Sequence, residues 1–429
     1  MTDVVPVRGE CAEGLRRSLF LCDRGMAAVI AAILMPLVIG GLGLGAETGF
    51  WYMKKNRLQA AADVAAHAAA IRLRAGATHA DLEAAVLSVA SGSGFMSSKG
   101  AHVVRVPPSE GRYMGLAGHV EVVLAETHPR MFSAIFSEAP MEVGARSVAA
   151  VHAGEEACAL ALLPGAEPGL SVSREGSFQA DGCALATNSA APMAVRVEPG
   201  GLVEANCIYS VGGVQMDGSL SLDCGGPRTR SHPVADPYVT LQEPAVQTLP
   251  CRSPGVTLAQ GRSGVLLPID WLGGRMAQRI CGDMAIRGNM HLLPGIYVAE
   301  GAVEVFPGGS LSGAGVTLYM RQSGRFVAHH GSSVDLSAAE SGLMAGIVIM
   351  GSRTGSRTIS VTGGHAAAMR GAVYAPTSEF RVTGFGSPHP SCLQVVAGRI
   401  TVEGPMSLKR GCSPATKVAY AGRQVAVVE

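Results

Sequence analysis

The sequence predicts three parts: a single N-terminal transmembrane helix continuing into an Ala-rich helix, a small α/β unit, and a mainly-β C-terminal domain folded as a parallel β-solenoid, or β-helix. Three observations predict this order. One long uncharged stretch lies near the start, only Pro6 and Pro36 of the 24 prolines precede Pro107, and Val-containing segments then recur every 20 to 25 residues. Because proline breaks helices, the helical part should end before Pro107.

Composition excludes several classes of protein. Hydrophobic residues make up 48% of the 429 residues, charged residues 16%, and the net charge is +1. This balance excludes a solvated disordered chain. It also lacks the basic footprint of a nucleic-acid binder, so no nucleic-acid partner is expected. A polytopic membrane protein is excluded because only one stretch is long and apolar enough to span a bilayer.

The transmembrane helix is assigned to residues 25–46, which carry no charge. As a helix these 22 residues would be about 33 Å long, enough to cross a bilayer core. Residues 1–24 then form a cytoplasmic N-terminal segment. A cleaved signal peptide is the alternative, but the segment before the apolar run is longer than signal peptides have.

Three glycines in the apolar stretch and just beyond it are candidates for helix packing. Gly41, Gly45 and Gly49 recur at every fourth position, which lets two membrane helices approach closely. Loose helix ending near the interface is the alternative. The Ala-rich stretch at 56–74 continues the helix and suits close packing against another helix. Self-association through both helices is therefore expected.

The cysteines indicate the orientation, since Lys and Arg are balanced across the span and the positive-inside rule is silent. Eight cysteines follow the span, an even number without metal-binding spacing, which indicates disulfides in an oxidising compartment. Buried free thiols are the alternative. The inferred orientation is single-pass in the inner membrane, with a cytoplasmic N-terminus and a periplasmic or surface-facing C-terminal domain. The candidate disulfide cysteines, whose pairing the sequence leaves open, are Cys158, Cys183, Cys207, Cys224, Cys251, Cys281, Cys392 and Cys412.

A small α/β unit is predicted after the Ala-rich helix. A second helix at 78–91 should begin at Thr78, with Asp81 at capping-box spacing. Apolar, β-rich segments follow at 102–106, 119–125 and 141–150.

A short helix with one apolar face is predicted between the last two of these strands. Met131, Phe132, Ile135 and Phe136 are spaced i, i+1, i+4 and i+5. We expect the two phenylalanines in the core of the α/β unit.

The N-terminal part resembles a known family. The matching residues are Arg24-Gly25, Pro36, the Glu47-x-Gly49 exit from the span, and the string Arg57-Leu58-Gln59-x-Ala61-Ala62-Asp63. They look like the N-terminal module of TadG-like proteins (TadE/TadG-like) of the Tad, or tight adherence, Flp pilus-assembly system. The segment 119–151 is similar to the strand, Phe-rich turn and strand that follow in these proteins. The resemblance covers about residues 15–152, and residues 47–153 form its helix plus α/β module.

The resemblance implies a non-enzymatic, membrane-anchored structural or assembly component of a Tad/Flp-type pilus system. The inner membrane and other Tad pilus-assembly subunits would be its partners. One position departs from the related pseudopilins, which carry Glu five residues after a processed glycine. Here Ile30 stands at that position after Gly25, so the prepilin signature is absent.

The β-rich exported domain is assigned to residues 154–429, with an irregular excursion near 227–280. Valines at about one-turn spacing should form one inward ladder, with three short strands in each turn. We expect Phe326-Val327 to continue this ladder after Val305. A β-sandwich is the alternative. The Gly-rich pattern also resembles the C-terminal part of longer TadG-like proteins. The repeated valines are Val172, Val197, Val305, Val361, Val382 and Val402.

No catalytic, cofactor-binding or metal-ligating residue is predicted, so the chain is expected not to be an enzyme and to need no cofactor. Its aspartates are scattered rather than paired, whereas a glycosidase needs two carboxylates across the sugar. His329 and His330 are adjacent and would face opposite sides of a strand. Two other functions stay open: an envelope or surface adhesin presented on the solenoid, which implies cell adhesion, and a carbohydrate-active β-helix enzyme.

Overall fold

The computed structural model describes residues 23–165, 167–251, 253–321, 323–355, 358–362, 369–383, 392–409 and 414–429. The chain divides into two compact units. The helix–sheet unit contains the chain up to Val151 together with Val425–Glu429, and the solenoid unit is His152–Gln424. The N-terminal segment predicted to be cytoplasmic lies outside the described residues, apart from its last two positions.

Helix α1 (Asp23–Arg74) is one continuous helix of 52 residues that includes Pro36. It is about 78 Å long. Its N-terminal half contains an 18-residue window with a mean hydropathy of 2.3, and only 6% of that window is buried. Within the part of the chain that the structure describes, α1 is the one helix long and apolar enough to cross a membrane. The prediction of an apolar helix continuing into the Ala-rich helix is confirmed.

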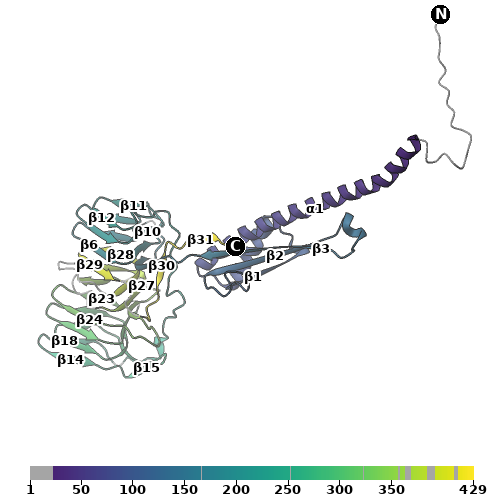
Figure 1. The fold of residues 1–429 in the computed structure, drawn as a ribbon. Coiled ribbons are helices and arrows are strands. Elements are labelled where there is room, and N and C mark those ends of the chain that lie inside the picture. The colour runs from purple at the N-terminus through teal and green to yellow at the C-terminus, as the bar shows by residue number, and fades with distance from the viewer. Residues whose placement is uncertain are drawn as a thin grey trace, which may run out of the picture. The chain divides into compact units, whose positions relative to one another are not determined.

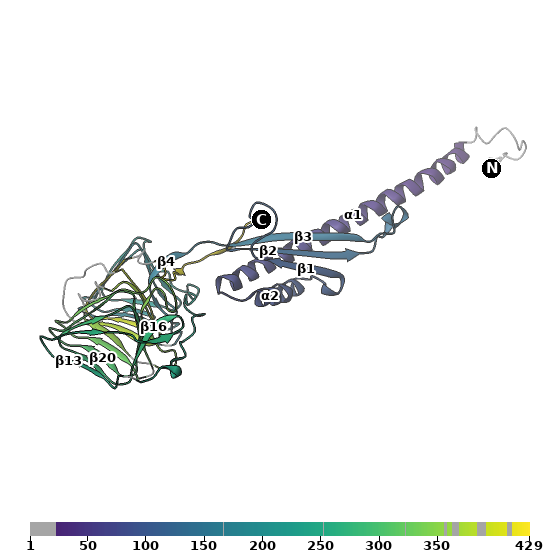
Figure 2. The same cartoon turned by 90° about the horizontal axis from the view of Figure 1, so that it is seen from below.

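The Ala-rich half of α1 packs on the protein's own sheet and on α2 (His79–Gly92) (Figure 2). The predicted close packing against another helix is provided by α2 of the same chain, and the small side chains let the strands approach closely as well. Helix α2 is capped as predicted, because the Thr78 hydroxyl and the Asp81 carboxylate each accept the other's backbone amide. The fully buried alanines are Ala61, Ala62, Ala65, Ala66, Ala69 and Ala70.

The sheet of the helix–sheet unit is antiparallel, in the order β1-β2-β3-β31. Its strands are β1 (Gly100–Arg105), β2 (His119–His128), β3 (Met141–Val151) and β31 (Val425–Val427), and a single 3-10 turn, η1 (Ser97–Lys99), precedes β1. Strand β31 comes from the end of the chain, and Val425 lies opposite Val151. The sequence analysis assigns 154–429 to one domain, whereas the structure returns Val425–Glu429 to the first unit. The solenoid is thus an insertion between β3 and β31.

The predicted short helix between β2 and β3 is a single 3-10 turn, η2 (Phe132–Ile135). Its apolar side chains do not enter the core: Ile135 is 86% exposed and Phe136 is 77% exposed. The prediction of a core position for the phenylalanine pair is therefore wrong. Their spacing gives a common apolar face, but this turn lies at the tip of the β2–β3 hairpin, beyond the strands that would cover it.

The solenoid unit is a parallel β-solenoid of about ten turns, as predicted. Its strands form three rows, which we call faces A, B and C, and the long strands β27 and β28 cross from face A to face B. Face A contains β10 (Ile208–Ser210), β7 (Ala184–Thr187), β4 (Glu155–Ala161), β28 (Leu393–Val402), β27 (Gly371–Thr383), β25 (Ile347–Gly351), β22 (Val316–Met320), β19 (Gly295–Ala299) and β16 (Arg275–Ile280).

Face B continues from the same turns. It contains β11 (Val214–Met216), β8 (Val195–Val197), β5 (Leu170–Val172), β26 (Ile359–Thr362), β23 (Arg325–Ala328), β20 (Ala302–Val305), β17 (Met284–Ile286) and β13 (Val256–Leu258). Face C contains β12 (Ser219–Leu222), β9 (Leu202–Ala205), β6 (Ser177–Asp181), β29 (Pro405–Lys409), β24 (Ser333–Leu336), β21 (Ser310–Gly313), β18 (Asn289–Leu292) and β14 (Ser263–Leu266). Two short strands add antiparallel edges to face A, β15 (Asp270–Leu272) beside β16 and β30 (Ala419–Ala421) beside β4.

The repeated valines form the predicted inward ladder on face B, and all six are buried. Val402 lies beside Val172, and Val172 lies beside Val197. One position differs from the prediction: Ala328, not Val327, lies beside Val305. The turn there is one residue longer than the analysis allowed.

The turns do not stack in chain order. Strand β28, near the end of the chain, pairs with both β4 and β5, which open the solenoid. The chain therefore enters at the middle, builds outward to β10–β12, and resumes at the opposite end with β13. Figure 1 shows β11 and β12 at one end of the solenoid and β14 and β15 at the other, with β28 and β30 between them.

The crossing between the two ends is a strap, residues 225–250, that lies on face A. Its η3 turn (Val246–Thr248) is its one described helical element. The strap buries Val234, Tyr238 and Leu249 against face A. Face A is covered on both sides, which explains its continuous apolar strands. The analysis placed an irregular excursion near 227–280, but regular strands resume at Val256.

Candidate membrane-anchor site

The β2–β3 hairpin is fastened to α1 through Glu47, where the apolar stretch ends. The Glu47 carboxylate is 2% exposed. It accepts hydrogen bonds from the Met131 amide at 3.0 Å, the Ser133 amide at 2.6 Å and the Ser133 hydroxyl at 2.8 Å. These donors lie at the start of η2, where backbone amides lack helical partners. The carboxylate therefore caps the hairpin turn.

The same face of α1 carries Gly43, one turn earlier. A Cβ at position 43 would lie 2.5 Å from the Phe132 ring, so only glycine leaves room for this contact. Gly43 and Glu47 together hold the hairpin tip at a fixed level on the helix. The sequence analysis gave Glu47 no partner, because no local pattern links it to residues more than 80 positions away.

The predicted packing glycines lie on the other side of the helix. Gly41, Gly45 and Gly49 are exposed, and a Cβ at any of them would have no heavy-atom neighbour within 4 Å. Positions 43 and 45 differ by about 200° around a helix. This glycine face is thus left open by the described part of the chain, while the hairpin occupies the opposite face.

The string that carries the family resemblance attaches α1 to the sheet. The Gln59 amide donates to the Arg146 carbonyl of β3 at 2.8 Å and to the Asp63 carboxylate at 2.9 Å. Leu58 is buried against the same sheet. These residue types therefore have a structural role: one polar contact and small apolar neighbours hold helix and strand together.

Aromatic and basic residues follow the apolar stretch directly. Phe50, Trp51 and Tyr52 succeed it, and the ammonium group of Lys54 lies 5.5 Å from the centre of the Phe50 ring. Trp, Tyr and Lys are enriched where a transmembrane helix leaves the bilayer. The aromatic residues played no part in the sequence-based assignment, and their position fits a helix that leaves a membrane here.

An ion cluster stabilises the sheet at the end opposite the hairpin tip. Glu121 is fully buried, with Arg105 at 3.3 Å and Arg146 also bound to it. Burial alone would raise the pKa of Glu121, but the Ser109 amide and the two arginines outweigh it and the pKa falls below its ordinary value.

In the solenoid unit, six of the eight candidate cysteines pair in three disulfides. These are Cys158–Cys183, Cys207–Cys224 and Cys251–Cys281. Cys392 is disulfide-bonded as well, and Cys412 lies outside the described residues. Every disulfide-bonded cysteine that the structure describes therefore lies in the solenoid unit, which the sequence analysis assigned to an oxidising compartment.

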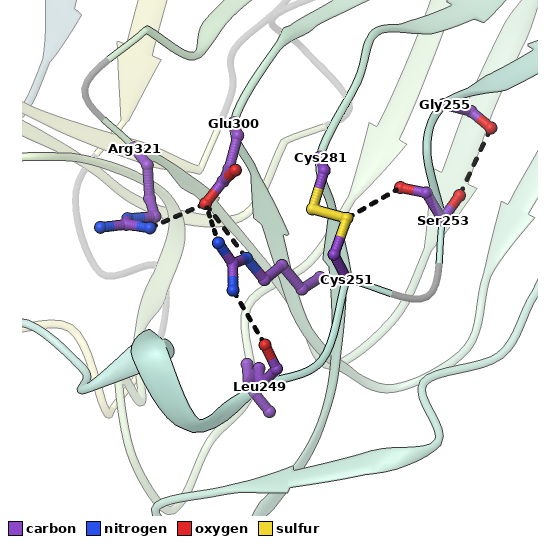
Figure 3. The surroundings of a disulfide bond; sticks show 8 residues. Leu249, Cys251, Ser253, Gly255, Cys281, Glu300 and Arg321 are labelled. Atoms are coloured by element: carbon purple, nitrogen blue, oxygen red, sulfur yellow. Dashed lines mark hydrogen bonds and ion pairs between the residues drawn. A yellow bond between two sulfur atoms is a disulfide. The ribbon is translucent and has the colours of Figure 1, made fainter.

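The strap ends at a cluster of cross-turn contacts (Figure 3). Cys251 is bonded to Cys281 beside β16. Glu300 accepts from Arg279 Nη2 at 2.8 Å and from Arg321 Nη1 at 2.7 Å. Arg279 also donates to the Leu249 carbonyl of the strap at 2.9 Å. The sequence analysis missed this ladder, although Arg279, Glu300 and Arg321 are spaced by 21 residues, one turn of the solenoid.

The polar residues that drew attention in the sequence have structural surroundings. Asp283 accepts the Ala302 amide at 2.7 Å, and the His329 ring stacks on Phe306 at 5.1 Å. Among the residues that the structure describes, no group of three or more His, Cys, Asp or Glu side chains is placed to hold a metal ion.

Together these features define a class: a protein with one membrane-spanning-type helix, a helix–sheet unit on that helix, and a disulfide-bonded β-solenoid inserted into the sheet. Residues 25–75 match the family model described as putative Flp pilus-assembly TadE/G-like. The TadG-like resemblance is thereby confirmed for α1. Comparison with curated proteins and with solved structures finds no match. The TadE/G-like domain supports a pilus-related role.

Proposed function

We propose that this chain is a non-enzymatic structural or assembly component of a Tad/Flp-type pilus system, anchored in the inner membrane by α1. The observation that carries the proposal is the TadE/G-like match on a helix whose apolar half is almost wholly uncovered. The open glycine face of Gly41, Gly45 and Gly49 suits a helix of another pilus-assembly subunit or of a second copy.

The orientation is argued from the cysteines. All seven described cysteines of the solenoid unit are disulfide-bonded, and disulfides persist in oxidising compartments. A cytoplasmic N-terminus and an exported solenoid satisfy this requirement with one span. The solenoid would then stand outside the inner membrane as a stiff arm.

A surface adhesin is the second candidate, and one feature of the solenoid favours it. The terminal turn exposes apolar side chains, among them Trp271 at 69%. Exposed apolar groups on a terminal turn favour binding of another molecule. An assembly partner could bind the same surface equally well. The two functions therefore differ in which molecule the solenoid binds. The other exposed apolar residues there are Val265, Leu267 and Ile269.

Fibre counting by electron microscopy tests the proposal, using a clean deletion strain with and without the full chain restored. We expect fibres to vanish on deletion and to return with the gene. Persisting fibres with reduced attachment would favour the adhesin instead. Unchanged fibres and unchanged attachment would refute both, and a search for a sugar-cleaving groove would follow.

A further inference from the structure

We infer that the tip of the β2–β3 hairpin, residues 131–136, is a second membrane contact that enters the lipid interface beside α1. The inference rests on the proposed anchor. The tip would contact the bilayer itself, at the level where α1 leaves the hydrocarbon core. Apart from α1, the tip has the largest cluster of exposed apolar side chains among the described residues of the helix–sheet unit. These side chains are not covered by the sheet.

The level of the tip on the helix is the first argument. Phe132 packs on Gly43, and Glu47 holds the amides of Met131 and Ser133. Position 43 lies inside the uncharged stretch and position 47 just beyond it. A bilayer that covers the helix as far as residue 46 therefore reaches the hairpin tip as well.

The composition of the tip is the second argument. No charged residue occurs from Met131 to Ser137, while Arg130 and Glu138 flank the turn. Arg130 donates to the Ala139 carbonyl at 2.8 Å, which closes the neck of the loop behind the tip. An uncharged apolar end on a charged neck matches the layering of a lipid interface, where large apolar side chains enter and charges remain near water.

The hydrogen bonding of the tip is the third argument. Backbone groups brought into lipid must find partners within the protein. The amides of Met131 and Ser133 donate to Glu47, and those of Phe136 and Ser137 donate to the Ser133 carbonyl at 3.0 and 3.2 Å. The same contacts satisfy the Glu47 carboxylate, which would otherwise be costly beside an apolar stretch. Four backbone amides of the exposed loop therefore already have partners within the protein.

The test uses the full chain in lipid nanodiscs, with a trifluoromethyl-phenylalanine replacing Phe136. Fluorine relaxation is measured with dissolved oxygen, which concentrates in lipid, and with a nickel chelate that stays in water. The matched control carries the same label at Met114, which is 64% exposed and lies in the β1–β2 loop at the opposite end of the sheet. A second label at Ile135 guards against a misfolded variant.

We expect oxygen to relax the labels at 135 and 136 while nickel leaves them unaffected, and the reverse at 114. Labels at 135 and 136 that relax with nickel as the control does would overturn the inference and leave the anchor standing. Shielding from both reagents that appears only with two copies per disc would show that protein covers the tip, which also overturns it. A chain that does not enter discs would refute the anchor and the inference together.

Discussion

At the scale of single residues, two buried glutamates hold the helix–sheet unit together. Glu47 connects α1 to the hairpin tip, and Glu121 connects β2 to Arg105, Arg146 and the Ser109 amide. A buried carboxylate is tolerated only where donors surround it. Neither partner set is readable from the sequence, because each joins residues that are remote along the chain or depend on strand register.

Glu121 makes the stability of this unit depend on pH. Its pKa is lower in the folded protein than its ordinary value of 4.5, so the ionised carboxylate stabilises the fold above that pH and the gain is lost as the pH falls through the folded value. We expect Glu121→Gln to cost about 2 kcal/mol at pH 7. Toward pH 3 the difference from the parent should shrink.

Thermal melting followed by circular dichroism at 222 nm checks this, since both described α-helices belong to this unit. Glu83→Gln, at an exposed site on α2, is the matched control and should change little. A cost of Glu121→Gln that is the same at pH 3 and pH 7 would contradict the ionic role.

At the scale of elements, the strap and face A of the solenoid depend on each other. The strap covers the outer side of face A, and its far end is fixed by Cys251–Cys281 and by the contact between Arg279 and the Leu249 carbonyl. Without the strap, apolar side chains such as Tyr319 and Tyr374 would face water. The disulfide therefore holds the strap in place over apolar side chains of face A.

Replacing both Cys251 and Cys281 by serine should lower the free energy of unfolding by about 3 to 4 kcal/mol in the loop-entropy description. Amide exchange should rise first in strap residues 230–250. The matched control replaces Cys158 and Cys183 by serine. Their disulfide joins neighbouring turns away from the end of the strap. Equal exchange of the strap in the two variants would contradict its fastening by Cys251–Cys281.

Many of the helices and strands could be predicted from the sequence, and the contacts that could not be predicted were missed for physical reasons. The period of the valines predicts turns and an inward ladder, because each turn repeats the same local environment. It does not predict which turns touch, so the position of Val402 beside Val172 was out of reach. Likewise, the alanines indicate close packing but not its partners, which are the chain's own sheet and α2.

At the scale of the whole molecule, the solenoid is an insertion with adjacent ends. Strands β3 and β31 are antiparallel neighbours, and Val151 lies opposite Val425. Residues 152–424 can therefore be replaced by an Asn-Gly turn that joins these two strands as a hairpin. This excised chain keeps α1, the hairpin tip and the glycine face, and it separates anchoring from whatever the solenoid contributes.

The most direct measurement is the number of surface fibres in the deletion strain carrying either the full chain or this excised chain at matched membrane levels. If the chain is an assembly component that needs both units, the full chain restores fibres and the excised chain, though present in the membrane, does not. Full restoration of fibres by the excised chain would contradict an assembly role for the solenoid and would leave adhesion as its function.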